Sequence, residues 1–178
     1  MALRSTIYKA DLQIADMDRN YYGSHALTVA RHPSETDERM MVRILAFALN
    51  AEEALAMSKG LSDPDEPDIW AKDLTGAIEH WIDLGQPDEK RMSKASSRAT
   101  RATVYPFGPA ADVWWKPLEN KVARLDNLRV VRIAARSAQA LAGLAERGME
   151  LQVTVQDGQV WVSSAKDSVE VELETLKG

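Results

Sequence analysis

An acidic hairpin signal constrains this chain more than any other feature, because two short segments rich in Asp, Ile and Trp flank a turn at Thr75-Gly76. If these two residues form the loop, three pairs of side chains oppose each other on one face: Asp68 and Asp83, Trp70 and Trp81, and Lys72 and Glu79. Directly opposed side chains have Cβ atoms about 4.5 to 5.5 Å apart, so both Asp carboxylates would reach a single divalent cation. A slip of one residue would move one carboxylate to the opposite face, so the prediction depends on this register.

The chain has 178 residues and no cysteine. That length suits a single domain, and we expect one compact domain over residues 1–178. The absence of cysteine excludes thiol catalysis, cysteine zinc sites and disulfides, and it favours a reducing compartment. The first residues lack the apolar core of a signal peptide, and no stretch is suited to span a membrane. We therefore expect a cytoplasmic protein without membrane partners.

The formal net charge of -5 bears on the choice of partner. It argues against broad attraction to nucleic acid, because that attraction comes mainly from Lys and Arg that replace phosphate counterions. An acidic metal site also adds negative charge that its own ion neutralises, so nucleic acid stays a candidate partner. The sequence contains no Gly-rich phosphate loop and no convincing Ser-His-Asp arrangement, and we expect no organic cofactor.

Alternation and turn signals predict a mixed order of strands and helices. Beside the hairpin at residues 68–84, strands are expected at residues 6–15, 21–30, 103–105, 128–133, 151–156, 159–163 and 169–173. Helices are expected from Ser34 to Leu49, from Pro87 onward, and at residues 110–116 and 137–147. This order predicts an α/β (α+β) fold, in which a compact single domain holds a mixed, mostly antiparallel sheet with flanking helices.

Both helices that flank the hairpin carry charged residues. On the first, Ser34 is expected to cap the N-terminus, and Glu38 falls on the apolar stripe, so its carboxylate should point toward the core or a site lining it. On the second, four basic residues recur at near-helical spacing and form a basic stripe: Lys90, Lys94, Arg98 and Arg101.

Together these residues suggest a metal-dependent phosphodiesterase site. Asp68 and Asp83 would ligate Mg²⁺ or Mn²⁺, and Glu38 would complete the shell directly or through water. Lys94 would orient the attacking water or stabilise charge on the phosphate. The plainer alternative is structural, with Asp68 capping a strand, Asp83 paired with Lys94 or Arg91, and Glu38 bonded to nearby backbone.

Two sets of residues resemble known proteins. Pro67-Asp68 followed by residues 83–85 (DLG) resembles the signature of the PD-(D/E)XK nuclease superfamily, in which a metal-binding hairpin follows a helix that often supplies a Glu. Residues 30–41 (ARHPSETDERMM) and 81–89 (WIDLGQPDE) are similar to the YaeQ family, and the resemblance extends over essentially the whole chain. It implies a variant of the restriction-endonuclease-like core in a bacterial family whose biochemical activity is not established.

The chain departs from the nuclease pattern at one position. The final Lys of the pattern would fall at Gly85, so the resemblance implies that Lys94, or less favourably Lys90, supplies the missing amine from the next helix. The first acid also has an alternative, because Asp73 precedes Asp83 as well, although it would lie on the other face of the hairpin.

Two functions follow from these observations. The first is a Mg²⁺-dependent hydrolysis of nucleic-acid phosphodiesters. The second is a noncatalytic regulatory module on a degenerate nuclease fold, which binds nucleic acid or protein through its Trp residues and basic stripe. A close-packed acidic cluster with Lys94 pointing inward favours the enzyme, whereas a Lys94 that points to solvent, or an Asp68 far from Asp83, favours the module. An exposed apolar patch without basic surroundings would favour a purely protein-binding domain.

Overall fold

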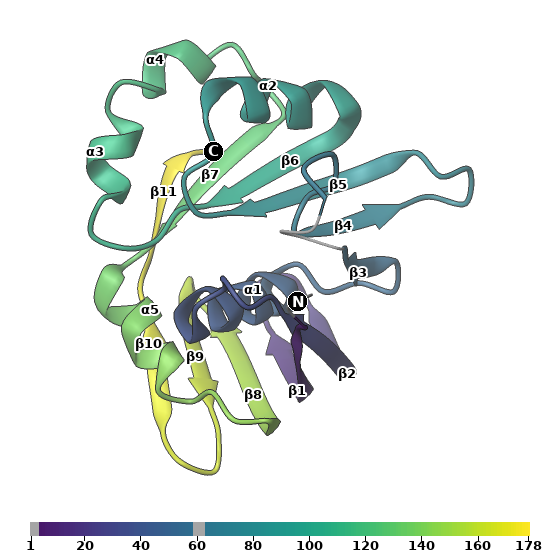
Figure 1. Ribbon diagram of the computed structural model, residues 1–178, viewed down its shortest axis with the longest axis vertical. Coiled ribbons are helices and arrows are strands. Elements are labelled where there is room, and N and C mark those ends of the chain that lie inside the picture. Colours follow the sequence, from purple (N-terminus) through teal and green to yellow (C-terminus); the bar gives the residue numbers. More distant parts are fainter. Residues whose placement is uncertain (1–3, 59–62) are drawn as a thin grey trace. The chain divides into compact units, whose positions relative to one another are not determined.

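The computed structural model describes residues 4–58 and 63–178 (Figure 1). By its contacts the chain forms two compact units: Met1–Leu49 with Arg136–Glu172, and Asn50–Ala135 with Leu173–Gly178. The predicted α+β class, with mixed sheets and flanking helices, is confirmed, whereas the single domain stays a prediction. Two predictions fall on residues outside the described ranges: the absence of a signal peptide rests in part on residues 1–3, and the Pro/Asp-rich loop expected at residues 62–67 begins at Ser62. Within the described ranges no helix is long and apolar enough to cross a membrane.

The first unit contains a five-stranded sheet in the order β10-β9-β8-β1-β2. Its strands are β1 (Thr6–Asp16), β2 (Tyr21–Arg31), β8 (Gly148–Gln156), β9 (Gln159–Ser163) and β10 (Ser168–Val171). The strands predicted at residues 6–15 and 21–30 pair as an antiparallel hairpin, and so do those predicted at residues 151–156 and 159–163. The second hairpin turns at Asp157-Gly158, where both residues have positive φ, as a type I′ turn requires. In β1, Ala10, Leu12 and Ile14 are buried, so the period of two buries one face of the sheet.

Helix α1 (Asp37–Leu49) belongs to the same unit and buries nine of its residues, Met40 to Ala48. It begins two residues later than Ser34 would require, because Thr36 accepts a hydrogen bond from the backbone N–H of Arg39 at its side-chain oxygen. The prediction that Ser34 caps this helix is therefore wrong. Phe47 contacts the edge of the His25 ring from β2, with ring centroids 5.3 Å apart, so the helix packs on the sheet.

The second unit contains a six-stranded mixed sheet in the order β11-β7-β6-β5-β4-β3. Its strands are β3 (Leu55–Met57), β4 (Ile69–Lys72), β5 (Ile78–Leu84), β6 (Ala99–Tyr105), β7 (Leu128–Ile133) and β11 (Leu173–Lys177). The neighbouring strands β5, β6 and β7 run parallel, and the other pairs in this sheet are antiparallel.

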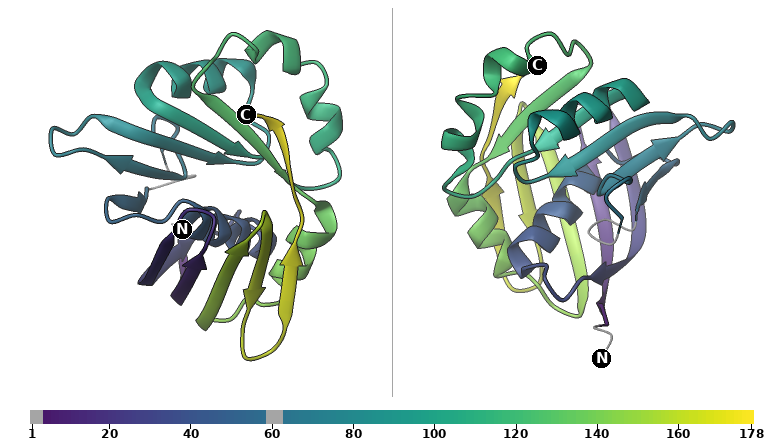
Figure 2. Two further views of the ribbon diagram at one scale, coloured as in Figure 1. Left: turned by 180° about the vertical axis from the view of Figure 1, so that it is seen from behind. Right: turned by 45° about the horizontal axis from the view of Figure 1, so that its top comes forward.

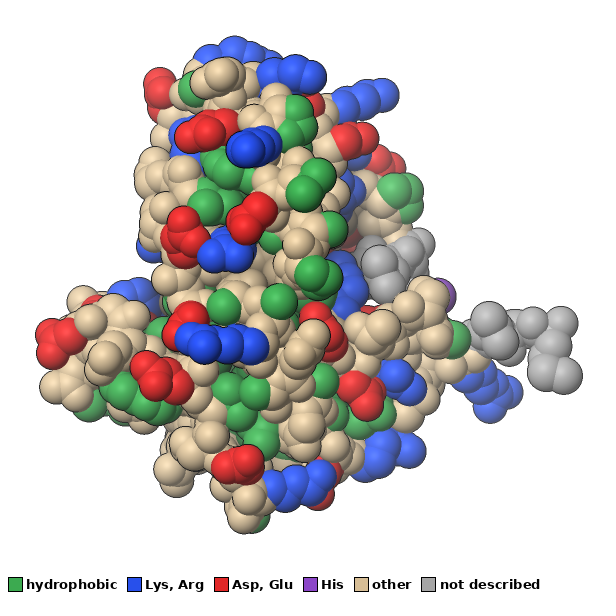
Figure 3. Space-filling view, turned by 90° about the vertical axis from the view of Figure 1, so that its left-hand side faces the viewer, with side chains coloured by type: hydrophobic (Ala, Val, Ile, Leu, Met, Phe, Trp, Pro, Cys, Tyr) green, Lys and Arg blue, Asp and Glu red, His purple; other side chains and the backbone are tan. Residues whose placement is uncertain are grey.

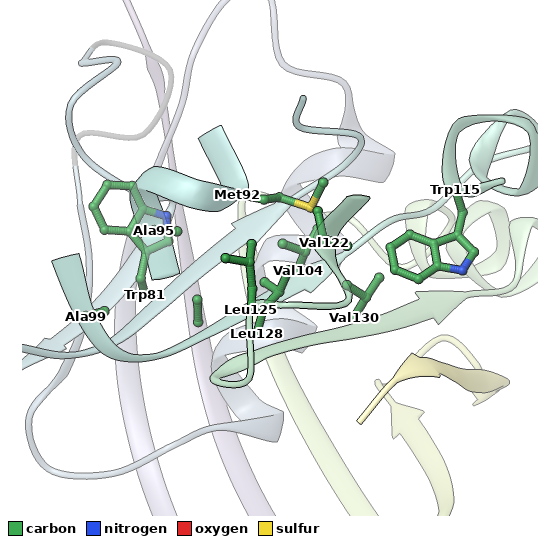
Figure 4. Packing of buried hydrophobic residues seen from close by; sticks show 11 residues of the cluster. Trp81, Met92, Ala95, Ala99, Val104, Trp115, Val122, Leu125, Leu128 and Val130 are labelled. Carbon is green, nitrogen blue, oxygen red and sulfur yellow. The ribbon is translucent and has the colours of Figure 1, made fainter. Parts of the chain in front are cut away.

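Three helices cover one face of this second sheet, as Figure 2 shows from two further directions. They are α2 (Glu89–Arg98), α3 (Ala111–Trp115) and α4 (Glu119–Val122). Met92 and Ala95 of α2 pack with Trp81 of β5 and Val104 of β6 in one buried cluster (Figure 4). This packing fixes α2 above the acidic end of β5, which positions the candidate site.

Two predicted elements near the C-terminus differ from the structure. The helix expected at residues 137–147 is the shorter α5 (Ala135–Ala142). The strand expected at residues 169–173 divides into β10 and β11, which belong to different sheets, at Glu172. Glu172 donates its backbone N–H to the side-chain oxygen of Ser137 and so leaves the strand ladder there.

Candidate functional site

The acidic hairpin is formed by β4 and β5. Trp70 pairs with Trp81 as the sequence predicts, so the register that brings the two Asp residues together is confirmed in this part of the hairpin. The predicted pair of Lys72 with Glu79 is wrong, because the register shifts after Ala71 and Lys72 pairs with Ile78. Lys72 instead places its ammonium nitrogen 3.8 Å from the centroid of the Trp70 ring.

Asp73 organises the turn and causes this shift in register. Its Oδ1 accepts hydrogen bonds from the backbone N–H groups of Thr75 and Ala77 at 2.8 and 3.0 Å, and from the Thr75 hydroxyl at 2.6 Å. The hydrogen bond from Thr75 is the largest cause that lowers the pKa of Asp73 below its usual value. The turn is therefore longer than two residues, and Asp73 is a turn residue rather than the first acid of a metal site.

Asp68 and Asp83 lie together at the other end of the hairpin. Both are buried, with exposed fractions of 5% and 3%. The backbone N–H of Asp68 lies 3.3 Å from Oδ1 of Asp83, and the backbone N–H of Leu84 donates to Oδ2 of Asp68 at 2.9 Å. Asp68 thus caps the strand pair, as in the plainer structural alternative, while remaining next to Asp83.

The carboxylate of Asp83 accepts four hydrogen bonds from this chain. Oδ2 accepts from Nε of Arg91 at 2.8 Å and from the Trp81 indole nitrogen at 3.0 Å. Oδ1 accepts from Nη2 of Arg91 at 3.1 Å and from the backbone of Asp68 at 3.3 Å. Since a carboxylate offers about four acceptor positions, all those of Asp83 are in use.

Arg91, from the first turn of α2, supplies the cation that two neighbouring carboxylates require. Burial alone lowers the pKa of Arg91, but the hydrogen bond to Asp83 and the charges of Asp83, Asp68 and Asp88 outweigh it and raise the pKa above its usual value. The same guanidinium donates to the carbonyl oxygens of Pro64 and Glu66 at 2.6 and 2.9 Å. It therefore ties the loop before β4 to the acidic end of β5.

Lys94 lies one turn further along α2 and points to a different acid. Its Nζ donates to Oδ1 of Asp65 at 2.7 Å, and this hydrogen bond is the largest cause that lowers the pKa of Asp65 below its usual value. Asp65 lies on the surface, with 75% of its side chain exposed. Lys94 thus pairs with Asp65, and Arg91 pairs with Asp83, which is one of the two pairings that the plainer structural alternative allows.

Glu38 is half-buried in the first turn of α1. It belongs to the first unit whereas the hairpin belongs to the second, and its part in a shared metal shell stays a prediction. The buried carboxylate of this region is Glu35, which is 3% exposed and accepts from Arg39 at 2.7 Å and from Arg43 at 2.6 Å. The apolar stripe of the helix could not identify Glu35, because Glu35 precedes the helix and is buried by ion pairs.

The basic stripe also differs from the expectation. Asp88 is the N-cap of α2 and accepts from the backbone of Arg91, so Pro87 lies outside the helix that it was expected to begin. Arg101 is not on this helix but on β6, where it pairs with His80 of β5. The stripe is therefore limited to Lys90, Lys94 and Arg98.

The arrangement does not fit a divalent metal ion. Mg²⁺ and Mn²⁺ bind oxygen atoms with free lone pairs, whereas those of Asp83 are occupied by Arg91, Trp81 and Asp68. Across residues 4–58 and 63–178, no three His, Asp or Glu side chains are grouped so that they could hold a metal ion. In this conformation Asp83 is engaged in an ion pair with Arg91, and metal binding by Asp68, Asp83 and Glu38 stays a prediction.

Comparison with known proteins shows a close similarity to one family. The family model described as YaeQ protein matches residues 1–173. Proteins described as uncharacterized protein YaeQ from Salmonella typhi and Escherichia coli (strain K12) are 44% and 42% identical over 97% of this chain and 96% of their own length.

Two crystal structures share the fold. The YaeQ protein from Xanthomonas axonopodis pv. citri has a TM-score of 0.95 at 47% identity, covering 98% of this chain and 99% of that chain. The YaeQ protein from Pseudomonas syringae has a TM-score of 0.94 at 38% identity, covering 98% of this chain and 97% of that chain. Because sequence and fold agree over nearly the full length, this chain belongs to the YaeQ family.

Proposed function

We propose that this chain is a noncatalytic nucleic-acid-binding module on a PD-(D/E)XK nuclease-like core. The order of α1, the acidic hairpin β4–β5 and α2 along the chain supports the nuclease-like core. The observation that carries the noncatalytic function is the occupation of Asp83 by Arg91. In this proposal the guanidinium of Arg91 occupies the carboxylate of Asp83, where a nuclease would bind its metal ion. We call this arrangement the closed hairpin.

The energetics favour the closed arrangement. A metal ion could take the place of Arg91 only if the guanidinium gave up its contacts with Asp83, Pro64 and Glu66. Hydrogen bonds to charged groups contribute about 1.5 to 3 kcal/mol each, and Mg²⁺ loses its own water ligands reluctantly. The free energy of metal binding would therefore have to offset the loss of several charge-assisted contacts.

The basic residues of α2 support nucleic acid as the partner. Lys90 and Arg98 are exposed, and Lys94 lies between them on the same stripe. Exposed cations at helical spacing can follow a phosphate backbone and bind it in a salt-dependent manner. The half-buried Trp70, with Lys72 over its ring, adds an aromatic and cationic pair on which a base of any kind can stack.

The distribution of apolar side chains gives less support to a protein partner. The large hydrophobic side chains that are exposed in the described residues belong to separate elements and turns: Ile7, Met17, Tyr22, Leu74 and Val113. On the face shown in Figure 3, hydrophobic side chains are interspersed with acidic and basic ones. Protein interfaces usually have a more continuous apolar centre than this.

Metal titration tests the noncatalytic part of the proposal. Mg²⁺ and Mn²⁺ are titrated by calorimetry into the wild type, Asp83→Ala and the control Glu79→Ala, which removes an exposed acid of the same hairpin. We expect the three proteins to give the same heats, and no hydrolysis of single- or double-stranded DNA or RNA. Metal binding and hydrolysis that Asp83→Ala alone removes would show that the chain is an enzyme.

Fluorescence anisotropy with labelled DNA and RNA strands of about 16 nucleotides tests the choice of partner. The double variant Lys90→Glu/Arg98→Glu should weaken binding by about tenfold at moderate salt, because each change replaces attraction to phosphate by repulsion. Lys116→Glu, an exposed cation at the end of α3, is the matched control. If the wild type binds no nucleic acid, the proposed partner is wrong.

A further inference from the structure

Two arginines lie on the face of the second sheet opposite α2. Arg101 of β6 is paired with His80 of β5, and Arg129 of β7 is paired with Thr103 of β6. Side chains of directly paired residues point to the same face, and Thr103 and Arg101 share that face because they are two residues apart. The four side chains therefore form one cluster on three adjacent strands, which we call the strand arginine cluster.

The spacing within this cluster follows from sheet geometry. Neighbouring strands are about 4.8 Å apart and a step of two residues covers about 6.6 Å, so the Cα atoms of Arg101 and Arg129 are about 8 Å apart. Side chains as long as arginine can converge over that distance on a single oxyanion.

The positive charge of the cluster is largely uncompensated. Arg101 is 59% exposed and its only ion-pair partner in the described part of the chain is Glu52, at the long distance of 3.7 Å. Arg129 is exposed, and no acidic side chain of residues 4–58 and 63–178 pairs with it. By comparison, Arg91 and Arg132 of the same unit each form an ion pair shorter than 3 Å.

The floor of the cluster is polar and uncharged. His80 is 2% exposed, and its Nε2 lies 2.8 Å from the hydroxyl of Thr103. Burial first, and then the charges of Arg101 and Arg129, lower the pKa of His80 to about 4, so the imidazole is neutral at pH 7. A neutral imidazole therefore adds no third positive charge beneath the two arginines.

We propose that the strand arginine cluster is a phosphate-binding site, in which Arg101 and Arg129 bracket one phosphoryl group. Guanidinium groups bind phosphate oxygens through paired charge-assisted hydrogen bonds, and a tetrahedral oxyanion offers oxygens to both arginines at once. A cation would be repelled by the same charges. The site lies on the face of the sheet that α2 does not cover, so it is separate from the ion pair of Asp83 and Arg91.

The phosphoryl group has two sources, a nucleic-acid backbone or a free polyphosphate. That the phosphoryl group comes from nucleic acid rests on the proposed function, whereas the existence of the phosphate site does not. Binding to both sources would make the cluster part of the nucleic-acid interface. Binding to free polyphosphate alone would make it a small-molecule site.

Inorganic tripolyphosphate and a labelled single-stranded oligonucleotide are the two probes, and the proteins are the wild type, Arg101→Gln/Arg129→Gln and the control Arg124→Gln. Arg124 is exposed on α4's C-terminal side and its side chain donates only to Ser93, at 3.4 Å. We expect the double variant to weaken tripolyphosphate binding by about tenfold or more, because it loses the charge-assisted contacts with phosphate. The control Arg124→Gln keeps these contacts and should weaken binding by less than about twofold. Thermal unfolding confirms that each variant is folded.

An NMR titration of the wild type adds a readout that a structural role would not change. Tripolyphosphate should raise the pKa of His80, because a bound anion offsets the charges of Arg101 and Arg129 that lower it. Glu52 cannot produce this change, because it contacts Arg101 in the free protein as well. No change at His80, or equal affinity in the double variant, would overturn the site. If the oligonucleotide binds independently of the two arginines, the proposed function stands and this inference fails. If tripolyphosphate binds through the cluster and the oligonucleotide does not bind, the site stands and the proposed partner fails.

Discussion

Replacement of Arg91 by Ala should lower the free energy of unfolding by about 3 kcal/mol. Breaking a buried ion pair by removing one partner usually costs about 3 to 5 kcal/mol, because the remaining charge stays buried without its counterion. Asp83 has 4% of its side chain exposed, whereas Arg91 has 29% exposed, so water screens part of the interaction and the lower end of the range applies. In a chain of 178 residues this loss corresponds to a fall in Tm of about 8 °C.

Urea unfolding followed by tryptophan fluorescence measures this loss. Four of the five tryptophans belong to the second unit, which contains Arg91, so the signal reports mainly on that unit: Trp70, Trp81, Trp114 and Trp115. Lys90→Ala is the control, because Lys90 is exposed and adjacent on the same helix. Its free energy of unfolding should remain within about 0.5 kcal/mol of the wild type.

A double-mutant cycle with Asp83→Ala separates the ion pair from the contacts with the loop. The double variant should lose about 2 kcal/mol less than the sum of the two single variants, because the guanidinium has less to stabilise once the carboxylate is gone. The contacts with Pro64 and Glu66 would account for the rest. An Arg91→Ala protein as stable as Lys90→Ala would refute the closed hairpin and with it the noncatalytic proposal.

Two further predictions concern His80 and Asp73. The unfolded chain protonates His80 with a pKa of 6.5 and the folded chain with a pKa of about 4, so stability is fully present above pH 6.5 and is lost as the pH falls toward 4. The loss attributable to this group should reach about 2 kcal/mol at pH 5, and a His80→Gln protein whose pH dependence equals that of the wild type would contradict it. Asp73→Ala should lower the urea concentration at the unfolding midpoint, because Thr75 and Ala77 lose their acceptor. Chemical unfolding beside Asp157→Ala, a turn variant in the other unit, checks this value, and equal stability of wild type and Asp73→Ala would show that the turn does not depend on its carboxylate.

The hairpin shows what alternation in a sequence can establish. The pairing of Trp70 with Trp81 was predicted from a two-residue loop at Thr75-Gly76, and it is confirmed although the loop itself is longer. The pairing near the turn was not, because the Asp73 side chain competes with the strand ladder for backbone N–H groups. Local patterning thus located the strands and the two acids, but a side-chain hydrogen bond decided the loop.

The choice of cation could not be made from spacing alone. Arg91 and Lys94 are three residues apart and share one side of α2, so helical periodicity allows either to face the hairpin. The planar guanidinium contacts both oxygens of Asp83 and also reaches two carbonyl groups, which a lysine ammonium cannot do from one position. A signal was present in the sequence, since Asp88 as the N-cap fixes Arg91 in the first turn of the helix, nearest the end of β5.

Gly85 stands where the nuclease pattern would have its final lysine, and the backbone conformation explains why a glycine is found there. The residue has a φ of 84°, where glycine is favoured, and its N–H donates to the carbonyl of Tyr105 at 2.9 Å as β5 ends. A side chain at this position would have open space around its Cβ, so conformation and not crowding selects against a lysine here. The turn that begins at Gly85 leads to Asp88, and through it to Arg91. The backbone that disfavours a lysine at the strand end is therefore the same one that places Arg91 beside Asp83, so on the proposed nuclease-like core a single backbone path accounts for both features.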